Sequence, residues 1–326
     1  MSSTKPIERV AIVGATGRIG GAFAKALLQT GKHTVTALTR PDSKGTLPEG
    51  VKVVKVNYDD EASLVEALKG QQFLAITLGV RAPADLHAKI ATSAGKAGVP
   101  YVMPNSYGYP VDRESLREED VYAKTVVQKV IDVESNGVSS PITLSCGFWY
   151  EWSLALGEQW FGFTIKDRKV TFFDDGKRTI TVSTWDQCGR ALSGLLSLPE
   201  SGASPSVTDW KIKAVLINSF RVSQRDMLDS LNRVMGTTDA EWEVRYEPAA
   251  KRFEDGAEEL KRGIFTGFAK MLYAGVFLAS NENSDYAAKS PLANDVLGLP
   301  KEELDEATKR AVDMVQGGWN PFAEYS

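Results

Sequence analysis

Three glycines near the amino terminus have the spacing of a phosphate-binding turn. Gly14, Gly17 and Gly20 form G-x-x-G-x-x-G in the stretch AIVGATGRIGG, between a β-rich run and an amphipathic helix. The first glycine permits a tight turn, the second lets the backbone approach a pyrophosphate, and the third lets the helix pack on the strand. The free N–H groups at the start of the helix then face the phosphates. The residues that we expect around a dinucleotide in this turn are Gly14, Ala15, Thr16, Gly17, Arg18, Ile19 and Gly20.

The end of the second predicted strand indicates which dinucleotide binds. Folds that take NAD usually place an acidic residue about 20 positions after the glycines, where it holds the ribose hydroxyls. Here the strand HTVTALTR ends at Thr39, and Arg40 follows. A guanidinium at this place suits a 2′-phosphate, and Lys44 and Arg18 can assist it. Asp42 is the counterargument, since it can take the acidic role, but the balance of charge favours NADP(H) over NAD(H).

Other parts of a dinucleotide crevice can be placed from where the predicted strands end. In a parallel sheet, ligands bind outside the carboxyl ends of the strands. The strand QFLAITLG ends at Leu78 and Gly79, the strand in VPYVMPNS ends near Asn105, and Phe148 follows the strand PITLSCG. We expect these four residues to line the crevice, with Phe148 beside the nicotinamide.

The source of a proton is a separate question. Many short-chain dehydrogenases use Tyr-x-x-x-Lys on one helix, but here Tyr286 and Lys289 are one residue too close and lie late in the chain. Lys124 remains, because Val127 and Ile131 share its predicted helical face. A lysine turned toward the interior has a lowered pKa and becomes a better proton donor near neutral pH. The alternative is a lysine whose stem packs while its amine reaches water.

Aromatic side chains gather directly after the sixth predicted strand, in CGFWYEW. Trp149, Tyr150 and Trp152 stand where the sheet opens toward a ligand, and they suit stacking on a flat substrate. The alternative is a hydrophobic seam between two halves of the chain. The stretch GIFTGFAKMLYAGVFLAS is apolar nearly all round, which predicts a buried helix that can also cover a pocket. An aromatic pocket wall favours a phenolic, polyketide-like or other ring-bearing small molecule.

The elements that position these residues alternate in type over the first half of the chain. Six β-rich runs alternate with helical runs, which predicts a Rossmann-type, doubly wound α/β fold with a parallel sheet. After about Gly147 the alternation loosens. The stretch KVTFFDDGKRTITVST predicts a hairpin that turns at Asp175-Gly176, and the rest of the chain is mostly helical in pattern. We expect a dinucleotide-binding domain over 1–150 and a smaller substrate-binding region over 151–326, with some of its segments folded back onto the sheet.

Composition excludes several other classes of function. The net charge is −4 and the cations are scattered, so nucleic acid is not an expected partner. The two cysteines and two histidines have no metal-binding spacing, and we expect no metal. The amino terminus lacks a signal-peptide core, and the longest apolar stretch is interrupted by Lys270. We expect a cytoplasmic protein that is a monomer or a homodimer and binds no membrane.

The stretches described above resemble the NmrA-like, isoflavone-reductase-like family of atypical short-chain dehydrogenases/reductases. The resemblance covers most of the chain and is strongest over about 10–150. VGATGRIGG is similar to the family's glycine loop, Thr39-Arg40 to its NADP-selecting strand end, and KTVVQKVIDVESNGVSSPIT to the helix that carries the reductases' lysine. The resemblance implies that Lys124 is the general acid or an anchor for the cofactor.

One segment departs from the family pattern. The family commonly has Pro-Ser-Glu-Phe-Gly where this chain has PNSYG, so Asn105 and Ser106 replace Ser-Glu and Tyr107 replaces Phe. The hydroxyl of Tyr107, at the carboxyl end of a strand beside the expected crevice, is a second candidate proton donor. Packing in the wall of the crevice is the alternative role for this tyrosine.

Three functions are compatible with these residues. The first is an NADPH-dependent reductase of secondary metabolism that transfers hydride to a C=C, C=O or C=N bond of a small aromatic-like molecule. The second is a non-catalytic NAD(P) redox sensor that regulates a protein partner, since the NmrA-like group includes such members and fold alone does not separate them. The third is an isomerase, epimerase or lyase on the same fold, which would consume no NADPH. The glycine turn, Arg40 and Lys124 favour the reductase.

Overall fold

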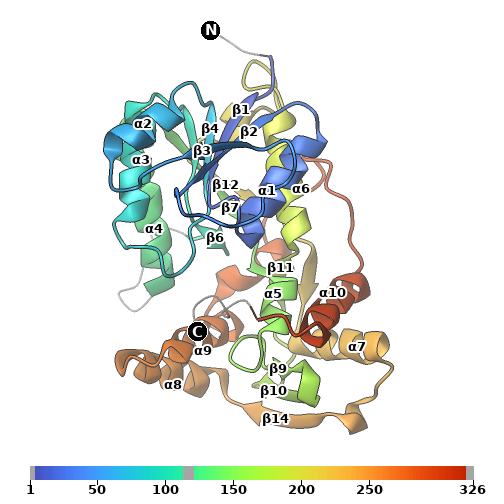
Figure 1. The fold of residues 1–326 in the computed structure, drawn as a ribbon. Coiled ribbons are helices and arrows are strands. Elements are labelled where there is room, and N and C mark those ends of the chain that lie inside the picture. Colours follow the sequence, from blue (N-terminus) through green and yellow to red (C-terminus); the bar gives the residue numbers. More distant parts are fainter. Residues whose placement is uncertain (1–3, 112, 114–120, 321–326) are drawn as a thin grey trace. The chain divides into compact units, whose positions relative to one another are not determined.

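The structure is a computed structural model that describes residues 4–111, 113 and 121–320. The chain divides into two compact units (Figure 1). The first unit comprises 1–146, 185–217 and 291–300, and the second comprises 147–184, 218–290 and 301–326. The amino-terminal unit thus ends at Cys146 rather than at residue 150, and two later segments join it.

A sheet of parallel strands forms the centre of the first unit, in the order β12-β7-β5-β4-β1-β2-β3, and the short β6 pairs with β7. The Rossmann-type α/β fold expected from the alternating pattern is therefore confirmed. The strands are β1 (Arg9–Val13), β2 (Thr34–Thr39), β3 (Lys52–Lys55), β4 (Phe73–Ile76), β5 (Tyr101–Met103), β6 (Tyr107–Gly108), β7 (Ser140–Ser145) and β12 (Lys213–Leu216).

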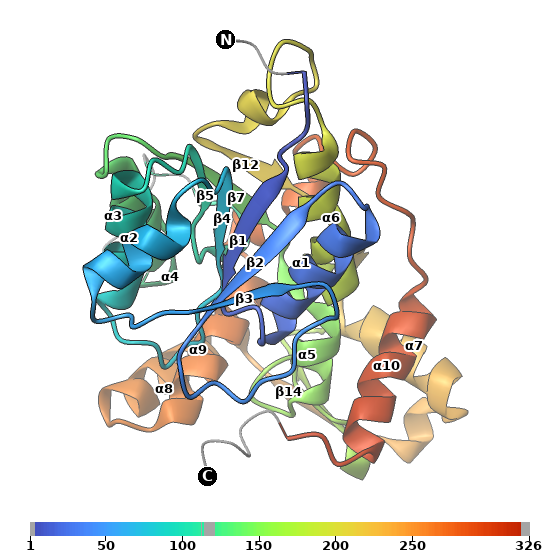
Figure 2. The same ribbon diagram turned by 45° about the horizontal axis from the view of Figure 1, so that its top comes forward.

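Helices cover both faces of this sheet (Figure 2). One face carries α1 (Arg18–Gln29) and α6 (Trp185–Ser197), and the other carries α2 (Glu61–Leu68), α3 (Leu86–Lys96) and α4 (Val121–Glu134). The side chains of successive residues in β1 point to opposite faces of the sheet. Ala11 and Val13 join the buried cluster beneath α2, α3 and α4. Part of the helix that the sequence predicts from about residue 117 lies outside the described residues.

Two later segments return to the first unit, and one of them adds a strand to its sheet. Strand β12 pairs in parallel with β7, with Lys213 opposite Ile142. Helix α6 packs so closely on α1 that a Cβ at Gly189 would lie 2.6 Å from the carbonyl oxygen of Ala22. The N–H of Ala293 donates to the carbonyl of Leu216, which ties the segment 291–300 to the end of β12.

The second unit contains two small sheets, in the orders β14-β10-β9 and β13-β11-β8, surrounded by helices. Its strands are β8 (Phe148–Trp149), β9 (Phe163–Thr164), β10 (Lys169–Phe173), β11 (Ile180–Ser183), β13 (Phe220–Val222) and β14 (Glu243–Glu247). Its α-helices are α5 (Tyr150–Ala155), α7 (Gln224–Met235), α8 (Ala249–Lys261), α9 (Phe265–Phe277) and α10 (Leu304–Gln316). Short 3-10 turns are η1 (Ile165–Asp167), η3 (Asp239–Glu241) and η4 (Glu282–Ala288) here, and η2 (Val207–Trp210) in the first unit.

The hairpin predicted at Asp175-Gly176 is wrong. A turn forms there, with Gly176 at φ +70°, but β10 and β11 belong to different sheets. The turn is bonded to other elements: the N–H of Ala249 donates to the carboxylate of Asp174, and the N–H of Arg225 donates to the carbonyl of Gly176. The local sequence thus predicts the turn correctly, and long-range pairing decides the partner of each strand.

The apolar stretch of α9 forms the expected helix, but this helix is not buried all round. Phe265 is 46% exposed, whereas Tyr273 and Phe277 are buried. The helix crosses α8 at Gly256 and Gly267, where a Cβ on Gly267 would lie 2.6 Å from the carbonyl oxygen of Gly256. None of the described helices is long and apolar enough to cross a membrane.

Candidate functional site: a dinucleotide crevice in the first unit

The glycine turn between β1 and α1 leaves no room for side chains at two of its three glycines. Gly14 has φ +81°, and a Cβ there would lie 2.1 Å from the carbonyl oxygen of Thr77. A Cβ at Gly20 would lie 2.3 Å from the carbonyl oxygen of Gly14. At Gly17 it would meet only that same oxygen, at 3.2 Å. The first and third glycines therefore serve packing, and the second leaves bare backbone on the open side of the turn.

The start of α1 fits an anionic group. Gly17 is the N-cap residue, no side chain caps the helix, and its first turn contains no acidic residue. The first N–H groups of a helix have no partner within the helix, and the helix dipole adds partial positive charge there. The bare backbone at Gly17 and this uncapped helix start together fit a pyrophosphate.

The crevice itself is set by the order of the strands. Strand β1 has β2 on one side and β4 on the other, so the chain reverses its direction of travel across the sheet at β1. In sheets of this kind the ligand lies outside the carboxyl ends of the strands at that reversal. The residues that come after β1, β2, β4 and β5 therefore lie at the sheet edge where a dinucleotide crevice is expected.

Cations collect where β2 and β3 end. The Arg40 side chain is 71% exposed and lies 3.8 Å from Asp42 (Nε to Oδ1), which is a loose pair. The loop that carries Lys44 folds back onto the glycine turn, since a Cβ at Gly45 would lie 2.5 Å from the Cβ of Thr16. The Lys44 loop therefore lies against the glycine turn. Binding of a 2′-phosphate by Arg40 and Lys44 stays a prediction.

Lys55 is a third cation at this end, and sequence reasoning missed it. It stands opposite Thr39 in the pairing of β2 with β3, and its amine donates to the carbonyl of Arg40 at 3.2 Å. The signal was present in the sequence, because Lys55 lies near the end of the predicted third strand and the carboxyl ends of parallel strands meet at one edge of the sheet. The pairing of the third strand with the second was the missing information.

Asn105 clamps the ends of β4 and β5 together. Its side-chain amide donates to the carbonyl of Leu78 at 3.1 Å and accepts from the N–H of Leu78 at 3.2 Å. Gly79, the next residue, is exposed. The structure therefore brings together Leu78, Gly79 and Asn105, the three residues expected at this end of the crevice.

The main chain of Asn105 is held in turn by α3 and α4. Its N–H donates to Nε2 of His87 at 3.2 Å, and its carbonyl accepts from the amine of Lys129 at 2.7 Å. The Nδ1 of His87 contacts the Asp132 carboxylate at 2.8 Å. Burial lowers the pKa of both His87 and Lys129 below their ordinary values. None of these three side chains was singled out from the sequence.

Lys124 does not face the interior as the sequence predicted. It is exposed, and Ile131, placed on the same apolar stripe, is 39% exposed. The buried face of α4 instead carries Ala123, Val130 and Val133. Valines lie on two faces of this helix, and packing against the sheet selected the other one. The role of Lys124 as a proton donor or cofactor anchor remains a prediction from the resemblance.

The hydroxyl of Tyr107 donates to the carbonyl of Ile76 at 2.9 Å. Burial raises the pKa of this phenol well above its ordinary value of 10.0. Its ring lies 5.9 Å from that of Phe23 in α1. A tightly bound phenol of high pKa is a poor proton donor, so this geometry favours the packing role over the catalytic one.

The aromatic cluster after β7 belongs to the second unit. Phe148 and Trp152 are half-buried and pack against Tyr273 and Trp319, with ring centroids 4.5 Å and 5.4 Å apart. Tyr150 is fully buried, and its hydroxyl bonds to that of Thr308 at 2.7 Å. Tyr150 is therefore a core residue of its unit rather than a wall of a pocket.

Trp149 is half-buried and precedes α5 as its N-cap residue. Contacts of Trp149 and Trp152 with a substrate, and of Phe148 with the nicotinamide, stay predictions.

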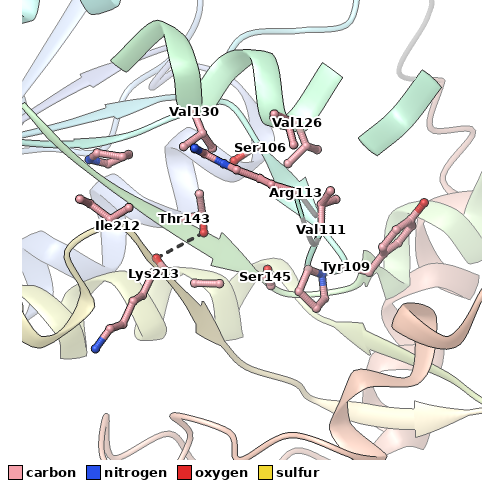
Figure 3. Close-up of a pocket in the computed structure, with 14 residues that line it drawn as sticks. Ser106, Tyr109, Val111, Arg113, Val126, Val130, Thr143, Ser145, Ile212 and Lys213 are labelled. Atoms are coloured by element: carbon pink, nitrogen blue, oxygen red, sulfur yellow. Dashed lines mark hydrogen bonds between the residues drawn. The ribbon is translucent and has the colours of Figure 1, made fainter. Parts of the chain in front are cut away.

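The first unit also has a cavity of about 350 Å³ between α4 and the strands β7 and β12 (Figure 3). Its walls are both apolar and polar, with Val126, Val127 and Val130 on the α4 side and Thr143 and Ser145 on β7. Arg113 at its edge is engaged in an ion pair with Glu134 at 3.0 Å. No residue of the glycine turn lines this cavity, and we assign it no ligand.

Comparison with known proteins confirms the resemblance to the NmrA-like family. The model of the NmrA-like family matches residues 6–149, which contain the glycine turn, both cation-bearing strand ends and the Asn105 clamp. An oxidoreductase of Aspergillus flavus is 26% identical over 302 residues, which cover 91% of this chain and 96% of the relative.

Two solved structures share the fold over almost their whole length. A structure of isoflavone reductase covers 93% of this chain and 99% of its own, with a TM-score of 0.73 and 20% identity. A structure described as AtPrR2 with NADP⁺ and (+)-pinoresinol covers 93% and 98%, with a TM-score of 0.69 and 18% identity. At these identities the solved structures support the fold.

Proposed function

We propose that this chain, an NmrA-like protein over its residues 6–149, is an NADPH-dependent reductase of small, ring-bearing metabolites. The observation that carries the proposal is the cation group at the ends of β2 and β3, next to a turn that fits a pyrophosphate. The group consists of Arg40, Lys44 and Lys55, and its Arg40 side chain forms only a loose pair with Asp42. The relative in Aspergillus flavus, described as an oxidoreductase, supports the same function.

Each end of the crevice has a separate task in this proposal. The backbone at Gly17 and the start of α1 hold the pyrophosphate, and the cation group binds the 2′-phosphate through charge-assisted hydrogen bonds. The Asn105 clamp with Leu78 supports the nicotinamide end. When bound, the dinucleotide supplies a hydride, and the protein's part is to orient it and to exclude competing reactions.

Lys124 is the residue that we propose for the proton or for the cofactor ribose. It is exposed at the first turns of α4. Lys129, five positions later on the same helix, is committed to the carbonyl of Asn105. The two lysines therefore have different tasks: Lys124 meets ligands and Lys129 holds the protein's own backbone.

The substrate class is inferred from aromatic chemistry. Phe148, Trp149 and Trp152 are half-buried aromatic side chains, which suit stacking on a flat ring system. The neighbouring structures described as isoflavone reductase and as containing (+)-pinoresinol support a substrate of this class. The reducible group would be a C=C, C=O or C=N bond conjugated to such a ring.

The experiment that tests this function follows the hydride. The wild-type protein is incubated with NADPH that carries deuterium at both C4 positions and a panel of ring-bearing ketones, imines and conjugated alkenes, whose reduction places the hydride on carbon, and products are analysed by mass spectrometry. The proposal expects deuterium in one product with equal consumption of NADPH, and Lys124→Ala to lower turnover about a hundredfold, as loss of a general acid does. Product without deuterium would indicate an isomerase or lyase, and dinucleotide binding without turnover of any compound would favour a redox sensor.

A further inference from the structure

We propose that Asp132 and His87 are positioning residues that hold Asn105, and with it the nicotinamide end of the crevice, in a pH-dependent manner. This inference rests on the proposed function, because it concerns how the same crevice holds its dinucleotide. His87 lies in α3 and Asp132 in α4, and neither lies in the glycine turn or at the cation group.

Every polar group of Asn105 has a partner within the first unit. Its side-chain amide is paired with both main-chain groups of Leu78, its N–H donates to His87, and its carbonyl accepts from Lys129. A residue held by four hydrogen bonds has little freedom to rotate. Loss of any one of them leaves a half-buried polar group without a partner, which is costly. The orientation of Asn105 therefore depends on His87.

Only one protonation state of His87 fits these contacts. Nε2 faces the N–H of Asn105 at 3.2 Å and must accept, so the proton of the neutral ring is on Nδ1. Nδ1 then donates to Oδ2 of Asp132 at 2.8 Å. The other oxygen of Asp132 accepts from the side-chain amide of Gln128 at 2.9 Å. Asp132 thereby fixes both the tautomer and the orientation of the ring.

Protonation of His87 would remove one support of Asn105. In the charged ring both nitrogens carry hydrogen, so Nε2 becomes a donor that points at another donor, the N–H of Asn105. The two must separate, and the clamp to Leu78 loses its fixed position. The clamp is therefore formed at neutral pH and loosened when His87 is protonated.

The charged groups around the imidazole ring set the pH at which His87 is protonated. On α4, Asp132 favours the charged ring, whereas Lys129 disfavours it. Burial outweighs both effects and lowers the pKa of His87 below 6.5. The other charged groups of α3 that face α2 and the loop before it pair at the surface: Lys89 with Asp85 and Asp59, and Lys96 with Glu61.

The order of the strands assigns the clamp to the nicotinamide half of the dinucleotide. The 2′-phosphate end lies at β2 and β3, and the pyrophosphate lies at the start of α1. The remaining half extends across the ends of β4 and β5, where Leu78 and Asn105 stand. A loosened clamp is thus expected to weaken the binding of NADP⁺ and to leave unchanged the binding of a ligand that lacks the nicotinamide.

The test compares two ligands across pH by calorimetry. NADP⁺ spans the whole crevice, whereas 2′-phospho-ADP-ribose carries the same 2′-phosphate and the same pyrophosphate diester but no nicotinamide, so titration of the phosphates cancels in the ratio of their affinities. From about pH 8 to about pH 5, we expect the wild-type ratio to fall about fivefold, which corresponds to one net hydrogen bond. His87→Gln offers an acceptor that does not titrate, and its ratio is expected to stay constant.

His33 provides the matched control. It is the other histidine of the chain, it is also buried with a lowered pKa, and it bonds to the carbonyl of Ile7. His33→Gln is expected to keep the wild-type dependence of the ratio on pH. Asp132→Asn keeps an acceptor for Nδ1 but removes the charge that favours the charged ring, so it is expected to move the transition to lower pH. This variant serves if His87→Gln does not fold.

Three results would overturn the inference. One is a wild-type ratio that does not change with pH, the second is a His87→Gln ratio that falls as the wild-type ratio does, and the third is an unshifted transition in Asp132→Asn. Each of them leaves the proposed function intact, because both ligands still bind. Failure of both ligands to bind the wild-type protein at any pH would instead refute the proposed function, and this inference with it.

Discussion

Substitution of Gly17 by alanine is expected to separate dinucleotide binding from folding. The residue has φ −78° and ψ 174°, which alanine adopts without strain, and the new methyl carbon would lie 3.2 Å from the carbonyl oxygen of Gly14. At that distance the carbonyl oxygen of Gly14 needs to move by only a few tenths of an ångström. Alanine is also a poorer N-cap than glycine, so we expect a loss of unfolding free energy below about 1 kcal/mol.

Binding is expected to suffer far more than stability. The methyl group would project from the bare backbone where the pyrophosphate approaches the start of α1. Displacement of the phosphates from these N–H groups removes at least one charge-assisted hydrogen bond, worth about 1.5–3 kcal/mol. We therefore expect the Kd for NADPH to rise at least about tenfold. Calorimetric titration, together with denaturant unfolding of the same sample, measures both quantities.

Gly20→Ala is the contrasting variant. Its methyl carbon would lie 2.3 Å from the carbonyl oxygen of Gly14 and 2.6 Å from Oγ1 of Thr77, both within the packed contact of helix and strand. We expect it to lose about 1–3 kcal/mol of stability, as overpacked cores do. Either of two results would refute this division of roles: Gly17→Ala binds NADPH as the wild type does, or Gly17→Ala loses as much stability as Gly20→Ala.

Three further outcomes are expected. Lys55→Met should weaken the binding of NADPH about fivefold or more and leave the binding of NADH unchanged, because the Lys55 amine bonds to the carbonyl of Arg40 and only NADPH carries the 2′-phosphate. Calorimetry measures both affinities, and equal weakening of both would contradict this prediction. Burial lowers the pKa of His33 and His87, so below pH 6.5 the unfolded chain binds more protons than the folded chain, and the free energy of unfolding should fall as the pH drops through that range. Denaturant unfolding of the wild type and of the two His→Gln variants measures this dependence. Variants whose stability depends on pH as strongly as that of the wild type would contradict it. Tyr107→Phe should retain most of the turnover, because the hydroxyl is bound to the protein backbone; a hundredfold loss in steady-state assays would instead make it a proton donor.

Local signals in the sequence were enough for the glycine turn and for the order of elements in the first unit. A strand, three glycines at fixed spacing and an amphipathic helix are short-range features, and the structure contains them at Arg9–Val13 and Arg18–Gln29. The position of Arg40 could be predicted in the same way, because it needs only the end of one strand.

Features that depend on pairing or on helix phase were not available from the sequence. Lys55 reaches the cation group through the register of β2 with β3. The contrast between exposed Lys124 and half-buried Lys129 depends on which face of α4 packs on the sheet. Valines lie on both faces, and the prediction from the sequence chose the wrong one. His87 and Asp132 lie 45 positions apart and are joined only in the folded unit.

The most direct test of NADP(H) binding at the cation group is calorimetry of NADPH, NADP⁺, NADH and NAD⁺ with the wild-type protein and with Arg40→Ala. We predict tight binding of both phosphorylated dinucleotides, at least about tenfold tighter than their unphosphorylated counterparts, with most of that preference lost in Arg40→Ala. Equal affinity for all four, or a preference set by oxidation state that ignores the 2′-phosphate, would contradict it.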